Sequence, residues 1–517
     1  MVESRKLLKT ELPEILGSRL QMLLAIIAGG LMPLAFAPYK IWPLAILLPT
    51  VLLWMVQSEQ RIKRIFLLSW LFGVAYLGVG FGWIYNSLHI YGKAPPLVAG
   101  GITASVVMFL ALFIAAAVSV CRFYQISSKI SPLWLLPVVW FAMEWIKGIV
   151  LTGFPWLSLG YAHTQSPLAG FAPLIGVYGV GAVSILMSLL LLRIIQQRRP
   201  IWLAGLVLLP LSGYALSQIT WTEPMGKSLK VALIQGNIPQ EMKWKYDKRQ
   251  EILQKYWRAT QQNWDNDLIV WPETAIPGRS SLIEETVLLP MAMAATERQS
   301  NLLVGVVYNE AKSEKFYNSM LLLGENQGVY HKRHLVPFGE YYPYRFILEY
   351  LRRWIRIPYS DLNEGAQQQS LLSVKGLKLG VSICYEDVFS RDILQDLPEA
   401  NILVNSSNDA WFGDSLAPPQ HLQISQMRAL ETARPLIRST NTGISAFIDF
   451  QGNISSQTEL FKEQTLNHTV TGRTGSTPFM FFAKIQPVLA IVILLLALGG
   501  LLRFRNFKQS NTKEVKS

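Results

Sequence analysis

The stretch that decides the fold of the middle of the chain is Leu377-Lys378-Leu379-Gly380-Val381-Ser382-Ile383-Cys384-Tyr385-Glu386-Asp387. Apolar residues alternate at its start and then run without interruption to Cys384, which predicts a buried β-strand. Acidic residues follow directly, as at the start of a helix. Ligands of open α/β sheets gather at the carboxyl ends of strands. Cys384 is therefore a candidate nucleophile.

The chain has only two cysteines, Cys121 and Cys384. Cys121 lies at the end of an apolar run and Cys384 lies in the polar middle, so a disulfide framework is excluded and a lone thiol remains. An isolated buried cysteine is also a common small packing residue. Its position alone leaves both interpretations of Cys384 open.

The length and charge of the chain indicate a membrane protein with a separate globular part. A chain of 517 residues is too long for one ordinary core, so we expect at least two domains. The 51% hydrophobic content averages long apolar runs at both ends with a middle of ordinary globular character. The net charge of +13 is compatible with nucleic acid, but the basic residues lie mostly beside the apolar runs. That distribution is typical of membrane topology and predicts no nucleic-acid partner.

Eight apolar stretches are long enough, or nearly so, to cross a hydrocarbon layer of about 30 Å. They lie near residues 18–36, 41–57, 65–84, 97–121, 132–150, 170–192, 201–217 and 483–502. The fifth contains Glu144 and Lys147, an ionisable pair that is costly in a membrane unless it faces the protein interior or the interface. Their spacing lets them contact each other. A helix-end pair and a functional pair are both open.

The basic residues of the short loops predict the orientation. One set of loops, with the segment after the last stretch, carries Arg61, Lys63, Arg64, Arg122, Lys129, Arg193, Arg198, Arg199, Arg503, Arg505 and Lys508. The alternate loops carry little more than Lys40 and Lys93. The positive-inside rule therefore puts both termini in the cytoplasm.

The first apolar stretch has features of a cleaved signal, because basic residues precede it and residues 35–37 have the small-x-small form. Six more stretches follow at once, so we expect a retained anchor. We predict a multi-pass protein of the bacterial inner membrane, with a transmembrane domain at 1–217, a periplasmic domain at 218–482, an eighth span at 483–502 and a cytoplasmic tail at 503–517.

Residues 225–475 alternate strand and helix patterns. The expected strands are Leu229–Gln235, Asp267–Trp271, Leu302–Tyr308, Tyr317–Leu323, Gly328–His334, the cysteine strand, Asn401–Asn405, Leu436–Thr440 and Ser445–Asp449, and the expected helices are Asp247–Gln262, Leu282–Arg298 and Gln420–Ala433. Such interleaving predicts a layered α/β domain with helices covering the sheets.

Three motifs end strands of this domain in a fixed order. They are residues 269–275 (Ile-Val-Trp-Pro-Glu-Thr-Ala), residues 330–340 (Tyr-His-Lys-Arg-His-Leu-Val-Pro-Phe-Gly-Glu) and the cysteine strand. Each alone is weak, because a Glu after Pro usually starts a helix and a Lys in a strand is usually solvated. Together they resemble the nitrilase superfamily, whose members use Glu, Lys and Cys in this chain order.

With seven apolar stretches before the domain and one after it, the whole chain resembles the bacterial apolipoprotein N-acyltransferases of that superfamily. The resemblance also covers residues 235–240, 405–414, 428–431, 434–435 and 438–441. It implies an αββα sandwich beside an eight-span helical bundle, with Glu273 as general base, Lys332 as cation and Cys384 as nucleophile. Trp244, Glu340, Tyr385 and Glu386 match further residues on which the family relies.

The chemistry of a thiol supports these roles. A cysteine with a pKa of about 8.5 is mostly protonated at neutral pH, so it needs a cation to lower its pKa or a base to take its proton. The Lys332 ammonium, with a backbone N–H, can stabilise the oxyanion of a tetrahedral intermediate by roughly 3–4 kcal/mol per donor. Glu340 and Glu386 are expected to orient the lysine and the base.

Two histidines offer a rival site. His331 and His334 flank Lys332, and a Cys-His pair is a common way to activate a thiol. In a strand, however, His331 points to the face opposite Lys332. As a metal site the pair lacks a third ligand and has two cations alongside. We expect neither a metal nor a cofactor.

The resemblance implies acyl transfer in two steps. Cys384 attacks an ester of a membrane phospholipid, phosphatidylethanolamine, and leaves a thioester. The amine of a diacylglyceryl-modified N-terminal cysteine, on an apolipoprotein, then attacks that thioester. Ping-pong kinetics follow from the covalent intermediate.

Both substrates are lipids, so the site must meet the bilayer. The segment Tyr341–Tyr359 predicts an amphipathic helix with apolar residues on one face and arginines on the other. Such a helix can lie in the headgroup region, and packing on its own domain is the alternative.

Two other functions compete with this interpretation. A membrane-tethered amidase of a small amide needs the same three residues but has no use for seven preceding spans. A non-catalytic receptor or transporter predicts ionisable residues along several spans, whereas they are nearly confined to the fifth.

Overall fold

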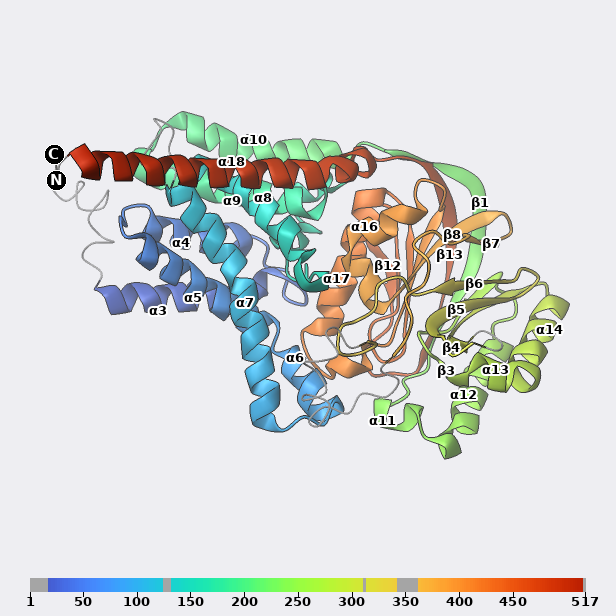
Figure 1. Cartoon of the computed structure of the whole chain (residues 1–517). Helices are drawn as coiled ribbons and strands as arrows, with labels where there is room; N and C mark the ends of the chain where they lie inside the picture. Colours follow the sequence, from blue (N-terminus) through green and yellow to red (C-terminus); the bar gives the residue numbers. More distant parts are fainter. Residues whose placement is uncertain (1–16, 124–131, 310–312, 342–360, 515–517) are drawn as a thin grey trace. The chain divides into compact units, whose positions relative to one another are not determined.

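The computed structural model describes residues 17–123, 132–309, 313–341 and 361–514 (Figure 1). The chain divides into two compact units. The helical unit comprises Met1–Gly82, Gly101–Ile219 and Phe481–Ser517. The α/β unit comprises Trp83–Gly100 and Thr220–Met480.

Apolar helices build the helical unit, and two of them, α7 and α18, begin in residues of the α/β unit. The helices are α3 (Ser18–Leu31), α4 (Leu44–Val56), α5 (Ile62–Gly80), α7 (Pro96–Phe123), α8 (Leu136–Lys147), α9 (Ala172–Gln197), α10 (Pro200–Ser217) and α18 (Pro478–Glu514). Each predicted apolar stretch overlaps one of them. In the described part of the chain, 6 helices are long and apolar enough to cross a membrane. Because α4 and α8 are shorter, the count of eight spans stays a prediction.

Large apolar side chains cover the outside of α10. Leu208 is 59% exposed and Leu211 is 57% exposed. A contiguous apolar surface of this kind is rare on a protein in water, whereas a helix satisfies its own backbone hydrogen bonds inside hydrocarbon. The helical unit is therefore suited to a membrane.

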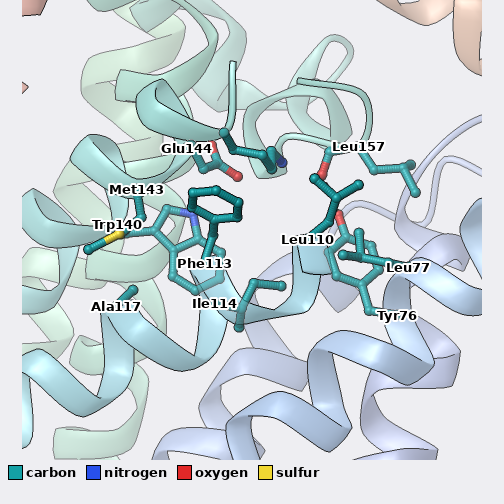
Figure 2. Close-up of a pocket in the computed structure, with 11 residues that line it drawn as sticks. Tyr76, Leu77, Leu110, Phe113, Ile114, Ala117, Trp140, Met143, Glu144 and Leu157 are labelled. Atoms are coloured by element: carbon teal, nitrogen blue, oxygen red, sulfur yellow. The ribbon is translucent and has the colours of Figure 1, made fainter. Parts of the chain in front are cut away.

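The ionisable pair of the fifth stretch lies in a pocket lined by α5, α7 and α8 (Figure 2). Glu144 is 6% exposed and Lys147 is 7% exposed. Oε1 of Glu144 accepts a hydrogen bond from the backbone N–H of Leu159 at 2.8 Å. The pair thus occupies the last turn of α8 and also faces the interior of the unit, where Glu144 ties that turn to the following segment.

Two sheets form the α/β unit. The first has the order β13-β1-β2-β4-β5-β6, with β3 paired to β4, and the second has the order β12-β11-β10-β9-β8-β7. The strands of the first sheet are β1 (Thr222–Gln235), β2 (Leu268–Val270), β3 (Ile276–Arg279), β4 (Asn301–Asn309), β5 (Phe316–Gly324), β6 (Gly328–His331) and β13 (Gln464–Gly475). Those of the second are β7 (Leu372–Val374), β8 (Leu377–Ile383), β9 (Ile402–Ser407), β10 (Leu436–Thr440), β11 (Ala446–Ile448) and β12 (Ile454–Gln457).

The two sheets pack face to face, with a layer of helices outside each. One buried cluster joins side chains of both sheets, such as Val231 and Val270 with Val381 and Val404. On the outer face of the first sheet lie α12 (Arg249–Gln261) and α14 (Leu289–Glu297), and on that of the second lies α17 (Ala417–Thr432). This arrangement confirms the predicted αββα sandwich.

Several elements differ from the prediction. The strands β3, β7, β12 and β13 were not predicted, and β6 ends at His331 rather than His334, so Lys332 follows the strand. The helix expected at Leu282–Arg298 is divided into α13 (Ser280–Ile283), a π-helical turn (Glu284–Leu288) and α14. Pro290 lies in the first turn of α14, where a residue without an N–H fits a helix start better than a helix interior. The helix predicted at Tyr341–Tyr359 lies outside the described residues except for Tyr341.

Candidate active site

The three predicted catalytic positions follow strands of the two sheets. Glu273 comes after β2, Lys332 directly after β6 and Cys384 directly after β8. The strands β1, β2 and β4 are parallel to one another, as are β8, β9 and β10. Carboxyl ends of parallel strands lie at one edge of a sheet. The topology thus gathers residues that lie far apart in the sequence.

Lys332 lies between two carboxylates. Its Nζ is 2.8 Å from Oε2 of Glu340 and 3.7 Å from Oε1 of Glu273, and its side chain is 1% exposed. Burial lowers the pKa of Lys332, but the charges of Glu340 and Glu273 outweigh burial and raise this pKa above its ordinary value. Lys332 is therefore a permanent ammonium in the neutral pH range, as the sequence analysis requires of the cation.

Two amide groups hold Glu273 in place. The Asn318 side-chain amide donates to Oε1 of Glu273 at 2.7 Å, and the backbone N–H of Asn408 donates to Oε2 at 2.8 Å. Asn318 also donates to Oε1 of Glu340 at 2.8 Å. A single side chain thus orients both carboxylates that face Lys332. Asn318 was not predicted, because no motif marks an asparagine inside β5.

Glu340 contacts the lysine as predicted. Its carboxylate accepts from Lys332 Nζ at 2.9 Å and from the backbone N–H of Val336 at 2.8 Å. The second bond closes the turn that follows Lys332. Glu340 therefore fixes both the ammonium and the segment that carries it.

Glu386 binds the backbone beside Lys332 and Cys384 rather than the side chains of the lysine and the base. Its carboxylate accepts hydrogen bonds from the backbone N–H groups of Ile383, Arg333 and His334 at 2.6, 2.5 and 3.0 Å. It also accepts from the Tyr330 hydroxyl at 3.0 Å. Burial raises the pKa of Glu386 to about 7, against the opposing effects of Lys332 and these N–H groups. Glu386 thus joins the backbone ends of β6 and β8 and aligns Lys332 with Cys384 through the main chain.

Cys384 has a strained backbone and a protonated thiol. Its φ of 53° lies in the left-handed region, which costs a residue other than glycine about 1–3 kcal/mol. Burial raises the pKa of the Cys384 thiol, the Glu273 charge raises it further, and Lys332 lowers it. The resting sulfur is a thiol, and a base must remove its proton before it can attack.

A buried set of charged side chains lies next to the backbone carbonyl of Cys384. The Cys384 carbonyl oxygen accepts from Asn405 Nδ2 at 3.2 Å and lies 3.3 Å from His421 Nε2. His421 is 2.8 Å from Asp387 Oδ1 and 3.1 Å from Asp409 Oδ1, and Arg438 pairs with both aspartates. Burial and Arg438 lower the pKa of His421, but the two aspartates outweigh them and raise it. This set was not predicted, because its members come from four separate segments.

The remaining predicted residues lie around this centre. Tyr385 is buried and packs edge-on against Phe389, with ring centroids 4.9 Å apart. Trp244 is half-buried and directly follows α11 (Gln240–Lys243). Its neighbour Lys243, which the sequence analysis did not single out, is 2% exposed and donates to the backbone oxygen of Glu273 at 3.0 Å.

The rival histidines have other partners. His331 Nδ1 lies 2.7 Å from Ser319 Oγ, and its ring stacks on Tyr317. His334 Nδ1 lies 3.0 Å from Asp392 Oδ2, and its ring stacks on Phe389. Within the described ranges no group of three or more His, Cys, Asp or Glu side chains has the arrangement of a metal site.

Comparison with known proteins identifies the relatives of the chain. Residues 230–479 match the carbon-nitrogen hydrolase family, and residues 28–190 match the apolipoprotein N-acyltransferase N-terminal domain. The apolipoprotein N-acyltransferase of Methylococcus capsulatus is 39% identical over 89% of this chain and 92% of its own length. That of Coxiella burnetii is 38% identical over 92% of this chain and 99% of its own length.

A solved carbon-nitrogen hydrolase from Helicobacter pylori is 15% identical, with a TM-score of 0.35, and covers 50% of this chain and 92% of its own. The two sequence relatives, by contrast, match nearly the whole chain, including both the helical and the α/β units. The chain belongs to the apolipoprotein N-acyltransferase family.

Proposed function

We propose that the protein transfers a fatty acyl chain from a membrane phospholipid to the N-terminal amine of a diacylated apolipoprotein, through a thioester on Cys384. The observation that carries the proposal is the buried Lys332 ammonium, which is held between Glu340 and Glu273 and lowers the pKa of the Cys384 thiol against burial and the Glu273 charge. Base, cation and thiol are the three groups that acyl transfer through a cysteine requires.

The first step forms the thioester. Glu273 takes the thiol proton, and the sulfur of Cys384 bonds to the ester carbonyl carbon. The Lys332 ammonium and a backbone N–H stabilise the resulting oxyanion. The C–O bond then breaks, the leaving oxygen receives the proton from Glu273, and a lysophospholipid departs. Phosphatidylethanolamine is the proposed donor.

The second step forms the amide. The amine of the acceptor's N-terminal cysteine bonds to the thioester carbon, Glu273 accepts an amine proton, and the C–S bond breaks. The sulfur takes up the proton and the thiol is restored. Ester to thioester is nearly balanced in free energy, whereas thioester to amide runs downhill, so the cycle needs no ATP. One product leaves before the second substrate reacts, which is ping-pong kinetics.

The apolar helices and the family support a place in the bacterial inner membrane. The basic loops support cytoplasmic termini and a periplasmic α/β unit. Attachment of a reporter that works only in the periplasm tests this orientation. A fusion after residue 260 should be active, and a fusion at the carboxyl terminus should be inactive.

The reaction is tested with purified protein in phospholipid vesicles and a synthetic diacylated lipopeptide. We expect equal amounts of triacylated lipopeptide and lysophospholipid, and no product with Cys384→Ser. Release of free fatty acid without lipopeptide acylation would instead indicate hydrolysis. Binding of the lipopeptide without either product would favour a receptor. Vesicles of a single headgroup type test the choice of phosphatidylethanolamine.

A further inference from the structure

Lys243 is a buried cation beside the reacting groups. It is the last residue of α11, its side chain is 2% exposed, and its Nζ donates to the Glu273 backbone oxygen at 3.0 Å. Its charge interacts with the Glu273 carboxylate and the Cys384 sulfur. In the part of the chain that the structure describes, the ammonium makes this one hydrogen bond. Two of its three N–H donors therefore remain for another acceptor.

Carboxylates outnumber cations around Lys332, so a second cation would stabilise this set. Glu273 and Glu340 together carry two negative charges, and Lys332 carries one positive charge, so this set has a net charge of −1. Transfer of the Cys384 proton to Glu273 leaves this charge at −1, and loss of the proton to solvent brings it to −2. A buried charge of that size is unfavourable at low dielectric. With Lys243 included, the same states have net charges of 0 and −1.

We propose that Lys243 is this second cation, which offsets the excess negative charge around Lys332 and thereby stabilises the thiolate of Cys384. The inference rests on the proposed function, since it concerns the same nucleophile. It adds a fourth residue to the base, cation and thiol. Lys243 acts on the sulfur through its charge and takes no part in bond making, so we call it a positioning residue. Its effect must appear in the titration of the Cys384 thiol.

The ionisation of Lys243 limits when it can act. Burial lowers the pKa of Lys243 to about 8, against the opposing effects of Glu273 and Cys384. The side chain is mostly charged at pH 7 and loses its charge above pH 8. Its support of the thiolate therefore fades over the range in which alkali alone begins to deprotonate thiols.

A purely structural role is the alternative, because the bond to the Glu273 carbonyl also fixes the backbone of the base. Lys243→Gln separates the two roles, since it keeps an N–H donor and removes the charge. Lys243→Arg keeps both. Lys245→Met is the matched control, because Lys245 lies two residues away and is exposed.

The test is the rate of Cys384 alkylation by iodoacetamide between pH 6 and 10, in a Cys121→Ala background. We expect Lys243→Gln to raise the apparent pKa of the thiol by about one unit and to slow alkylation at pH 7 about tenfold. Lys243→Arg should stay within about threefold, and Lys245→Met should match the parent. In the parent the rise in rate should flatten above pH 8, and Lys243→Gln should lack this feature.

A Lys243→Gln variant whose thiol titrates like the parent would overturn the proposal, even if its acyl transfer were slow. If that variant does not fold, the pH dependence of alkylation in the parent protein is the test. An alkylation rate that rises above pH 8 without flattening would likewise overturn the proposal. Alkylation needs no acyl donor. If phospholipid does not acylate the parent protein, the proposed function is refuted. The alkylation test of Lys243 can still be carried out in that case.

Discussion

Two clusters of charged side chains meet at Cys384, and they differ in how closely their members are paired. The lysine cluster consists of Glu273, Lys332 and Glu340, and the histidine cluster consists of Asp387, Asp409, His421 and Arg438. In the histidine cluster every side chain is 0% exposed and each ion pair is 3.4 Å or shorter. In the lysine cluster Glu340 is 13% exposed, and Lys332 is 3.7 Å from Glu273.

The difference separates a supporting role from a reactive one. The histidine cluster has two negative and two positive charges when His421 is protonated, and it holds the Cys384 carbonyl oxygen. Because this set is neutral and its charges are closely paired, we expect its members to keep their protons during the reaction. The lysine cluster has an excess of carboxylate and a long contact at Glu273, so one carboxylate can accept a proton. Changes in the lysine cluster should therefore alter the chemistry first, and changes in the histidine cluster should alter the stability first.

The largest expected effect comes from the base. Glu273→Gln keeps one of the two oxygen acceptors that bind Asn318 and Asn408 and cannot take a proton, so acyl-enzyme formation should slow by about 10²–10⁴-fold. Single-turnover formation of the acyl adduct measures the rate. The melting temperature should stay within a few degrees of the parent. A rate within threefold of the parent would remove Glu273 from the role of base.

Removal of the Lys332 cation should slow acyl-enzyme formation slightly less than removal of the Glu273 base. Lys332→Met leaves Glu273 and Glu340 facing each other without a positive charge, and it withdraws an oxyanion donor, so acyl-enzyme formation should slow by about 10²–10³-fold. Lys332→Arg is the matched control, because it keeps the charge. Equal rates for Lys332→Met and Lys332→Arg would show that charge at this position is irrelevant.

The histidine cluster should respond in stability first. Arg438→Met leaves Asp387 and Asp409 in a buried site with one cation, and loss of one partner from a buried ion pair costs about 3–5 kcal/mol. Chemical unfolding of the purified protein in detergent measures the loss. Folded molecules should still form the adduct, since no reacting group is removed. A variant of parental stability without any adduct formation would reverse the assignment of roles.

The smallest expected effect is a change of stability with pH. The pKa of His421 is raised in the folded state, so its stabilising contribution is complete below its ordinary pKa of about 6.5 and is lost as pH rises through the folded value. Asp387 and Asp409 make the folded protein less stable at acid pH, in the opposite direction to the effect of His421. Burial raises the pKa of Asp387 and Asp409, but His421 and Arg438 outweigh burial and lower both, so their contributions are lost as pH falls below about 4.

His421→Asn removes the alkaline part of this dependence. Unfolding free energies measured at pH 6 and pH 9 should differ less in the variant than in the parent. Gln426→Asn, which shortens an uncharged buried side chain on the same helix, is the control that should keep the parental pH dependence. The same pH dependence in His421→Asn as in the parent would exclude His421 as its source.

The sequence predicted the layers of the α/β unit and the positions of its main strands along the chain, because apolar patterns mark buried strands. It missed β13, which is polar along most of its length and contributes Val470 to the shared core, with Leu466 packed against that core. It also missed the extent of β1, which pairs with β13 from Thr222 to Gln235. An outer strand of this kind is held by backbone hydrogen bonds, and these leave little trace in composition.

The site was predictable where a residue ends a strand. Glu273, Lys332 and Cys384 stand in such places, and the resemblance of their motifs, in this chain order, to the nitrilase superfamily was enough to propose them. Asn318, Lys243 and His421 were not predictable, because their closeness depends on the order of strands in the sheets and on the placement of α11 and α17. The role of Glu386 was predicted in part, since its bonds to backbone N–H groups show only in three dimensions.

The most direct test of the central claim is the mass of the Cys384 peptide after the protein meets phospholipid without an acceptor. We predict an increase equal to one fatty acyl group on Cys384, sensitive to hydroxylamine and removed by added diacylated lipopeptide. An acyl group on another residue, or lipopeptide acylation by an enzyme whose Cys384 never carries one, would contradict the account.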